Sequence, residues 1–348
     1  MSNPTPVQPT PRLAPLWQRG RDFLECEVPI ICGAMTWISN PKLVSSVCEL
    51  GGFASLAGGN MPPDLFAEAI DATAALTSHA FGANIIVIAP NYRRHLDICC
   101  EKQLSHIIFA GSLPRRGEVR QAKESGAKVI CFASTASMAE RMIRFGADAL
   151  ILEGSEAGGH IGHVSTIVLL QSILFEFGEQ LPIFVAGGIA HGAMIAHLSL
   201  MGAAGVQLGT RFVVAEECEA HPLFKQAFIK ARAREAVSTP QYSSALPVVA
   251  VRALKNSAMA SFGELQLRLL KELADGSITR QEAQYKVEEY WIGGLRRGAV
   301  DGDIASGSLM AGQSVGLLRR TQPLREILQD LVDEADAALA ACAARLRP

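Results

Sequence analysis

The chain has 348 residues, of which 49% are hydrophobic and 19% charged, and this composition is sufficient for a large buried core. Thirty-two Lys and Arg nearly balance 34 Asp and Glu, and the net charge of -2 argues against nucleic acid or an anionic membrane as partner. The eight cysteines form no CxxC pair. Together with the lack of a signal peptide or long apolar run, they predict reduced thiols in a cytoplasmic protein.

The chain begins with the proline-rich stretch "MSNPTPVQPTPRLAP". Such a composition lacks the regular apolar spacing of a packed helix or strand. We therefore expect residues 1–22 to form a loose arm.

Short apolar, β-branched runs recur along the first two-thirds of the chain. Nearly continuous apolarity, rather than alternation, is typical of parallel strands that are covered on both faces. The runs occupy residues 28–35, 52–58, 80–88, 105–111, 127–133, 147–154, 182–188 and 205–212.

Helical patterns lie between these runs. One begins with a capping Asn40 and with Pro41 in its first turn, and two others stop at Gly146 and Gly202. Strand–helix units repeated about every 25 residues predict an α/β fold, a closed TIM (β/α)8 barrel. A doubly wound sheet is the alternative, but "CGAMTW" after the first run lacks its phosphate fingerprint.

In a TIM barrel the active site lies at the carboxyl ends of the strands. The sixth run is followed there by "EGSEAGGHIG" at residues 153–162, where a single His160 stands among glycines. The seventh and eighth runs end in the glycine-containing segments "VAGGIAHG" and "QLGTRF". Glycine lets backbone N–H groups approach an anion closely, and the start of the next helix adds a positive dipole end. These exits therefore predict a phosphate site at Gly187, Gly188, Gly209 and Thr210, although tight turns would also explain the glycines.

Ordered motifs between about residue 24 and residue 335 resemble those of the nitronate monooxygenase (2-nitropropane dioxygenase) family, which includes flavin-dependent enoyl-ACP reductases. The motifs are "PIICGAMTWIS", "GGFASLAGGNMP", "EGSEAGGHIG", "AGGIAHG", "GVQLGTRF" and "GDIASGSLMAGQSVGL". The resemblance implies an FMN-binding barrel with a small α-helical second domain. It also implies that the predicted phosphate residues hold the FMN phosphate, while other residues contact the rest of the flavin. Those residues are Gly33, Ala34, Met35, Asn84, Glu153, Gly158, Gly159 and Gln313.

In such an enzyme His160 would face the flavin with the substrate between them, as a base or a hydrogen-bond donor. The alternative is a structural histidine that caps a helix beginning near Val164. Glu156 has the position of an acid that braces the loop rather than a second catalyst. The histidines show no spacing that a metal would need, so we expect no metal site.

The domain boundaries follow from the position of the helical patterns after the eighth run. Residues 23–214 are expected to form the barrel, completed by residues 304–348. The amphipathic helices of residues 215–303 are expected to form a lid or substrate domain, or equally a contact surface in a homodimer.

Two reactions fit the resemblance. We place first a nitronate monooxygenase, which oxidises a small alkyl nitronate and passes the electrons to O2. The alternative is a reductase that takes hydride from NAD(P)H and delivers it to an enoyl thioester on acyl carrier protein, or to a quinone. A non-catalytic flavin-binding protein is also compatible, although it could dispense with His160.

Overall fold

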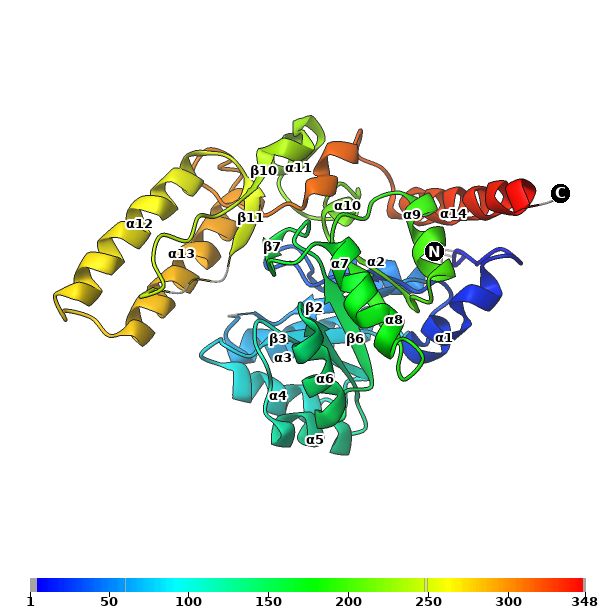
Figure 1. The fold of residues 1–348 in the computed structure, drawn as a ribbon, viewed down its shortest axis with the longest axis horizontal. Helices are drawn as coiled ribbons and strands as arrows, with labels where there is room; N and C mark the ends of the chain where they lie inside the picture. The colour runs from blue at the N-terminus through cyan, green and yellow to red at the C-terminus, as the bar shows by residue number, and fades with distance from the viewer. Residues whose placement is uncertain (1–4, 60, 247, 249, 347–348) are drawn as a thin grey trace.

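The protein is described by a computed structural model that covers residues 5–346 except 60, 247 and 249. Eight parallel strands close into a barrel in the order β1–β2–β3–β4–β5–β6–β8–β9, and β1 pairs with β9 through Ile31 and Gln207. The predicted TIM barrel is therefore confirmed and the doubly wound sheet is excluded (Figure 1). The strands are β1 Ile30–Cys32, β2 Phe53–Ala57, β3 Gly82–Ile86, β4 His106–Ala110, β5 Lys128–Ala133, β6 Ala149–Glu153, β8 Ile183–Ala186 and β9 Gly205–Leu208.

Helices surround the barrel and begin and end where the sequence places its caps. The side chain of Asn40 accepts a hydrogen bond from the amide of Leu43 (3.0 Å), and Gly146 takes a left-handed conformation (φ 98°) that ends α6. A π-helical turn at Leu170–Leu174 joins α7 to α8, and α14 packs along α9. The surrounding helices are α2 Pro41–Glu49, α3 Pro63–Leu76, α4 Tyr92–Glu101, α5 Arg116–Glu124, α6 Ala136–Phe145, α7 Thr166–Leu169, α8 Phe175–Phe177, α9 Gly192–Leu200, α10 Thr210–Val213 and α14 Leu324–Leu346.

Apolar side chains fill two layers of the barrel. One layer lies inside the strands and includes Phe53, Ile108 and Phe184, all with no exposed surface. The other lies between strands and helices and is continuous around the barrel. This packing makes the barrel a solid core whose open end is available for a ligand.

The N-terminal segment is packed against the barrel, so the expectation of a loose arm is wrong for the described residues 5–22. Helix α1 (Ala14–Leu24) buries Trp17, whose Nε1 donates to Ser199 Oγ at 3.0 Å. The amide of Val7 donates to the carbonyl of Leu50 at 2.9 Å. Most of the prolines precede α1, and Pro15 lies in its first turn, where a helix tolerates proline. Leu13, just before the helix, and Trp17 and Leu24 within it are fully buried.

A helical domain extends to one side of the barrel (left in Figure 1). It contains α11 (Pro222–Lys230), β10 (Ala236–Ser238), β11 (Val251–Leu254) and the long hairpin of α12 (Ser257–Ala274) and α13 (Arg280–Ala299). Phe262, Leu269 and Trp291 form a separate small core between the two hairpin helices. Strand β11 also pairs with β7 (Gly159–His160), so backbone hydrogen bonds connect the helical domain to the loop after β6.

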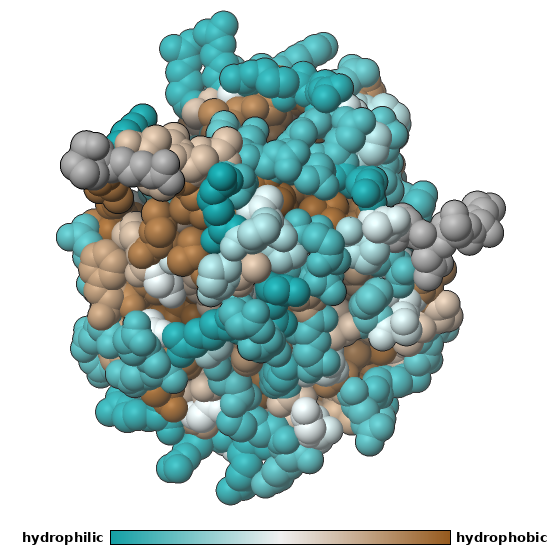
Figure 2. All heavy atoms as spheres, turned by 90° about the vertical axis from the view of Figure 1, so that its right-hand side faces the viewer, coloured by the Kyte–Doolittle hydropathy of each residue, from teal (hydrophilic) through white to brown (hydrophobic). Residues whose placement is uncertain are grey.

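The surface is mixed in polarity. The end of the molecule seen in Figure 2 is mostly hydrophilic, with separate apolar patches between the charged side chains. Among the described residues, no helix combines the length and the apolarity that crossing a bilayer requires.

Candidate active site

A cavity of about 320 Å³ opens at the carboxyl ends of the barrel strands, within the usual size of small-molecule and cofactor sites. The loops that follow β1, β3, β4, β5, β6, β8 and β9 line it, as the barrel fold predicts. The helical domain and the segment after it provide the remaining wall. Every residue predicted for the site lines this cavity except Gln313.

The residues predicted to hold a phosphate lie at the exits of β8 and β9, which we call the cradle. Gly187 and Gly188 have positive φ angles of 99° and 74°, which a residue with a side chain rarely adopts. On the opposite side, Thr210 Oγ1 accepts a hydrogen bond from the amide of Gly312 (2.9 Å). The hydroxyl proton of Thr210 is then free to be donated to an anion.

The helix after β8 does not add the dipole that we expected at this cradle. The amide of Gly192, the first residue of α9, donates to Glu334 Oε2 of α14 at 2.7 Å. The next amide, of Ala193, donates to Nδ1 of His191 at 3.1 Å. A carboxylate and an imidazole already occupy this helix end, so an anion in the cavity would depend on the loop amides and Thr210.

The opposite side of the cavity is formed by residues at the ends of β1 and β3. Gly33 and Ala34 have little or no side chain, and Met35 continues the same wall from the end of β1. Asn84 projects from β3 with 9% of its surface exposed, and it lines the cavity. A wall of small residues on this side and glycine turns at the exits of β8 and β9 are compatible with a bound flavin.

Glu153 stands at the end of β6, where the strand pairs with β8 through Ala186. It faces the cavity on one side and is enclosed by the barrel on the others, and burial raises the pKa of its carboxyl to about 8. Burial is the one cause of this shift, and no hydrogen bond within the described part of the chain opposes it. At neutral pH the group is mainly the neutral acid, which can donate a hydrogen bond to a ligand in the cavity.

His160 is held in the cavity by backbone pairing with the helical domain. It pairs with Val251 of β11, and the amide of Ile161 donates to the carbonyl of Ala250 at 2.8 Å. Its side chain is 29% exposed, and its Nε2 lies 3.5 Å from Oε1 of Glu288 on α13. We did not anticipate Glu288, because nothing in the amphipathic pattern of α13 distinguishes it from the exposed glutamates beside it.

The alternative role for His160, capping the next helix, is excluded by the contacts of Glu156. The Glu156 carboxylate accepts hydrogen bonds from the amide and Oγ1 of Thr166, the latter at 2.8 Å, and thereby caps the start of α7. Glu156 therefore braces the loop, as its position suggested.

The wall opposite the barrel depends on close packing inside the helical domain. The amide of Ser308 donates to the carbonyl of Gly294 at 2.8 Å, and a Cβ on Gly298 would lie 3.0 Å from the Ser308 carbonyl oxygen. These glycines in α13 let the returning chain run against the helix. As a result Leu295 of α13 and Met310 of the returning chain both reach the cavity. The glycines of α13 are visible in the sequence, but the sequence does not indicate that Leu295 and Met310 line the cavity.

Gln313 lies beside the main cavity. Its amide donates to the carbonyl of Glu156 at 2.9 Å, and its side chain lines a neighbouring groove with Lys230, Arg232 and Arg319. The contact with a flavin that the resemblance implies for Gln313 stays a prediction.

The lining of the main cavity carries little charge. Among the described residues that line it there is no Lys or Arg, and the ionisable side chains are Glu153 and His160. Much of the remaining lining is apolar. Its larger apolar side chains are Met35, Ile38, Ile86, Ile88, Phe132, Met138, Ile161, Ile189, Leu208, Phe224, Leu295 and Met310.

Comparison with known proteins agrees with this architecture. The family model described as nitronate monooxygenase matches residues 18–95 and 87–334. The structure of FabK from Thermotoga maritima superposes with a TM-score of 0.82 at 33% identity, covering 98% of this chain and 100% of that one. An octahydroindene-carboxyl-CoA dehydrogenase of Mycobacterium tuberculosis is 28% identical over 90% of this chain and 94% of its own length. A probable nitronate monooxygenase of Staphylococcus aureus is 26% identical, with 92% and 98% covered. The chain belongs to the nitronate monooxygenase family.

Proposed function

We propose that the protein is an FMN-dependent oxidoreductase that takes hydride from NAD(P)H and reduces an α,β-unsaturated acyl thioester. The observation that carries this proposal is the uncharged, largely apolar lining of the cavity around His160. The similarity to FabK, at 33% identity over nearly the whole chain, supports it, and so does the similarity to an octahydroindene-carboxyl-CoA dehydrogenase, whose name also contains a CoA thioester.

The charges around the cavity favour a neutral substrate over a nitronate. A nitronate is an anion, and transfer of an anion from water into an apolar cavity is costly unless a cation or several donors receive it. Here the described lining has no Lys or Arg, and the carboxylate of Glu288 lies next to His160. An enoyl thioester is uncharged at its reacting atoms, so it avoids this cost.

A flavin, when bound, supplies a ring that accepts hydride from the nicotinamide and donates it to the β-carbon of the substrate. Gly187, Gly188 and Thr210 are suited to hold its phosphate, and Glu153 to donate a hydrogen bond from its protonated carboxyl. His160 then has two tasks. Its ring can hydrogen-bond the thioester oxygen and supply the proton that the α-carbon needs after hydride has arrived at the β-carbon.

Nitronate oxidation by O2 is the second candidate, supported by the relatives described as probable nitronate monooxygenases. For that reaction His160 would act as a base toward a nitroalkane or as a donor toward the nitro oxygens of a nitronate. The fold and cavity are the same in both cases, so the electron donor separates the two candidates. Reduction of a quinone by NAD(P)H would share that donor with the first.

The test is anaerobic mixing of the purified, FMN-loaded protein with NADPH, NADH or an alkyl nitronate in separate cuvettes. We expect a nicotinamide to abolish the absorbance of the oxidised flavin and a 2-enoyl-CoA to restore it. Restoration by a quinone alone would favour a quinone reductase. Loss of absorbance with the nitronate but with neither nicotinamide would refute the proposal in favour of nitronate oxidation, and a protein that binds no FMN would refute both.

A further inference from the structure

We propose that Glu288 of the helical domain is a positioning residue for His160: it binds the proton on Nε2 and so fixes the tautomer and orientation of the ring. The inference rests on the proposed function only in taking His160 as the group that acts on the substrate. The pairing itself is a property of the protein without substrate and can be measured there.

The first observation concerns the Nε2 atom of His160. This atom is fully buried, and it has no hydrogen-bond partner among the described residues. Leaving a buried nitrogen unpaired costs about 1–3 kcal/mol, so a partner is expected nearby. The nearest charged group is Oε1 of Glu288, at 3.5 Å. Catalytic hydrogen bonds are often this long before substrate binds and shorten in the complex.

The second observation concerns the other edge of the ring. The His160 side chain is 29% exposed although Nε2 is not. The accessible surface therefore belongs to the rest of the side chain, and His160 lines the cavity. Nδ1 lies on the ring edge away from the buried Nε2. One edge faces a carboxylate and the other faces the space for a substrate. This is the arrangement in which a carboxylate sets the tautomer of a catalytic imidazole.

The position of Glu288 is set by its neighbours on α13. Val287 and Trp291 are buried in the small core of the hairpin, which fixes the rotation of the helix about its axis. The start of α13 is fixed by a capping box, in which Thr279 and Glu282 bond to each other's amides. These contacts hold the helix in one register.

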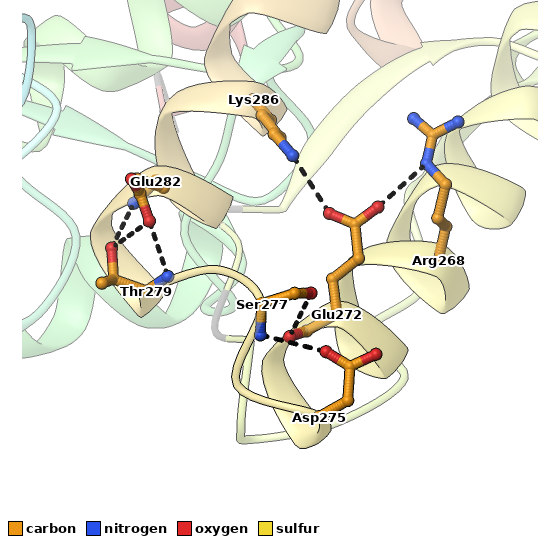
Figure 3. A network of polar contacts seen from close by, with 7 residues as sticks. All are labelled: Arg268, Glu272, Asp275, Ser277, Thr279, Glu282 and Lys286. Atoms are coloured by element: carbon orange, nitrogen blue, oxygen red, sulfur yellow. Dashed lines mark hydrogen bonds and ion pairs between the residues drawn. The ribbon is translucent and has the colours of Figure 1, made fainter.

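The tip of the hairpin is further tied by ion pairs. Glu272 of α12 meets Lys286 at 3.0 Å and Arg268 at 3.8 Å (Figure 3). The next glutamate, Glu289, is exposed and lines an outer groove together with these cations. Of two adjacent glutamates, one therefore lies among cations at the surface and the other lies against His160.

The chemistry that follows concerns where the protons are. With Glu288 ionised, a proton on Nε2 is favoured, so the neutral ring has its lone pair on Nδ1 toward the cavity. When the ring carries a second proton, that proton is on Nδ1, and it can pass to the α-carbon of the substrate while Nε2 keeps its own. Glu288 takes up no proton in this step, and solvent replaces the proton that His160 loses.

The test compares Glu288→Gln and Glu288→Ala with Glu289→Gln as the matched control, all in the FMN-loaded full chain. The first measurement is 15N NMR of histidine-labelled protein without substrate, with the His160 signals assigned from a His160→Asn variant. We expect the Nε2–H tautomer in the wild type, in Glu289→Gln and in Glu288→Gln, whose amide oxygen still accepts a hydrogen bond. In Glu288→Ala we expect a mixture of tautomers.

The second measurement is steady-state turnover of a 2-enoyl-CoA with NAD(P)H. We expect Glu288→Ala to lower kcat by about tenfold to 100-fold, as for other partners of functional histidines, with KM and thermal unfolding temperature little changed. Glu288→Gln should retain part of the activity. An Nδ1–H tautomer in the wild type, or the wild-type tautomer in Glu288→Ala, would overturn the inference. Failure of the proposed function would appear separately, as normal tautomers in a protein that does not turn over enoyl thioesters.

Discussion

Glu153 offers a sharp test of the electrostatics of the cavity, because its replacement by glutamine mimics the protonated form. Burial raises the pKa of Glu153 from its ordinary value near 4.5 to about 8 in the folded chain. The unfolded chain therefore releases this proton at lower pH than the folded chain does. Ionisation of Glu153 therefore lowers the free energy of unfolding. This destabilisation is absent below pH 4.5, grows as pH rises, and reaches its full size above pH 8.

The size of the effect follows from the same shift. Each pKa unit corresponds to about 1.4 kcal/mol, so the destabilisation is about 3 kcal/mol at pH 7 and about 5 kcal/mol above pH 8. Water in the open cavity solvates part of the carboxylate and reduces these values. We therefore expect Glu153→Gln to stabilise the protein by about 1–3 kcal/mol at pH 7, and by little at pH 4.5.

The assay is urea unfolding of wild type and Glu153→Gln at pH 4.5, 7 and 8.5, with equal cofactor content in both samples. A stability difference that rises with pH and levels off above pH 8 is the expected result. A difference that is the same at all three values would refute the reasoning, since it would mean that the carboxyl ionises equally easily in both states. Ser155→Ala, which changes a half-buried, uncharged side chain of the same loop, serves as a control for general effects on folding.

Three further predictions concern the packing and the cradle. Trp17→Ala should lower the free energy of unfolding by about 3–5 kcal/mol, measured by urea titration; an effect below about 1 kcal/mol would mean that the N-terminal helix does not pack as described. Burial lowers the pKa of His106 to about 4, so the unfolded chain alone binds this proton between pH 6.5 and 4, and the wild type should lose up to about 3 kcal/mol over that range relative to His106→Gln. Thermal unfolding of the wild type and of His106→Gln at several pH values measures this difference. Stability curves that stay parallel across the pH range would contradict the prediction. Gly188→Ala places a Cβ 3.2 Å from that of Glu156 at a φ of 74°, and with about 1–2 kcal/mol of strain it should weaken FMN binding about tenfold in a fluorescence titration, whereas unchanged affinity would argue against a phosphate at this turn.

The barrel was predictable because its signals are local. Each strand is a short apolar run, and the helix between two strands has its own cap, such as Asn40 at the start of α2. The residues at the carboxyl ends of the strands then meet at one end of any closed barrel. For this reason the glycines of the cradle and His160 could be assigned to one cavity without knowledge of any contact.

The parts that escaped prediction depend on contacts between distant segments. Glu288 is 128 positions after His160 in the chain, and its neighbour Glu289 has the same chemistry but a different environment. The prolines in the first residues favour a loose arm, and the spacing of Leu13 and Trp17 is too short a signal to predict a packed helix. These two side chains are buried because the barrel surface lies against them. The capture of the α9 amide by Glu334 likewise requires the last helix to lie against that end.

The pairing of β7 with β11 determines which segments two related barrels could exchange without loss of the site. The segment that walls the cavity also supplies the strand that holds the histidine loop and the acid that faces its ring. Exchange of residues 236–299 between two such proteins would transfer the shape of the substrate space and the alignment of its reactive imidazole as one inherited unit. Exchange of the α12–α13 hairpin alone, without β11, would change the cavity wall. The histidine loop would then keep its own β11 strand beside a hairpin from the other protein.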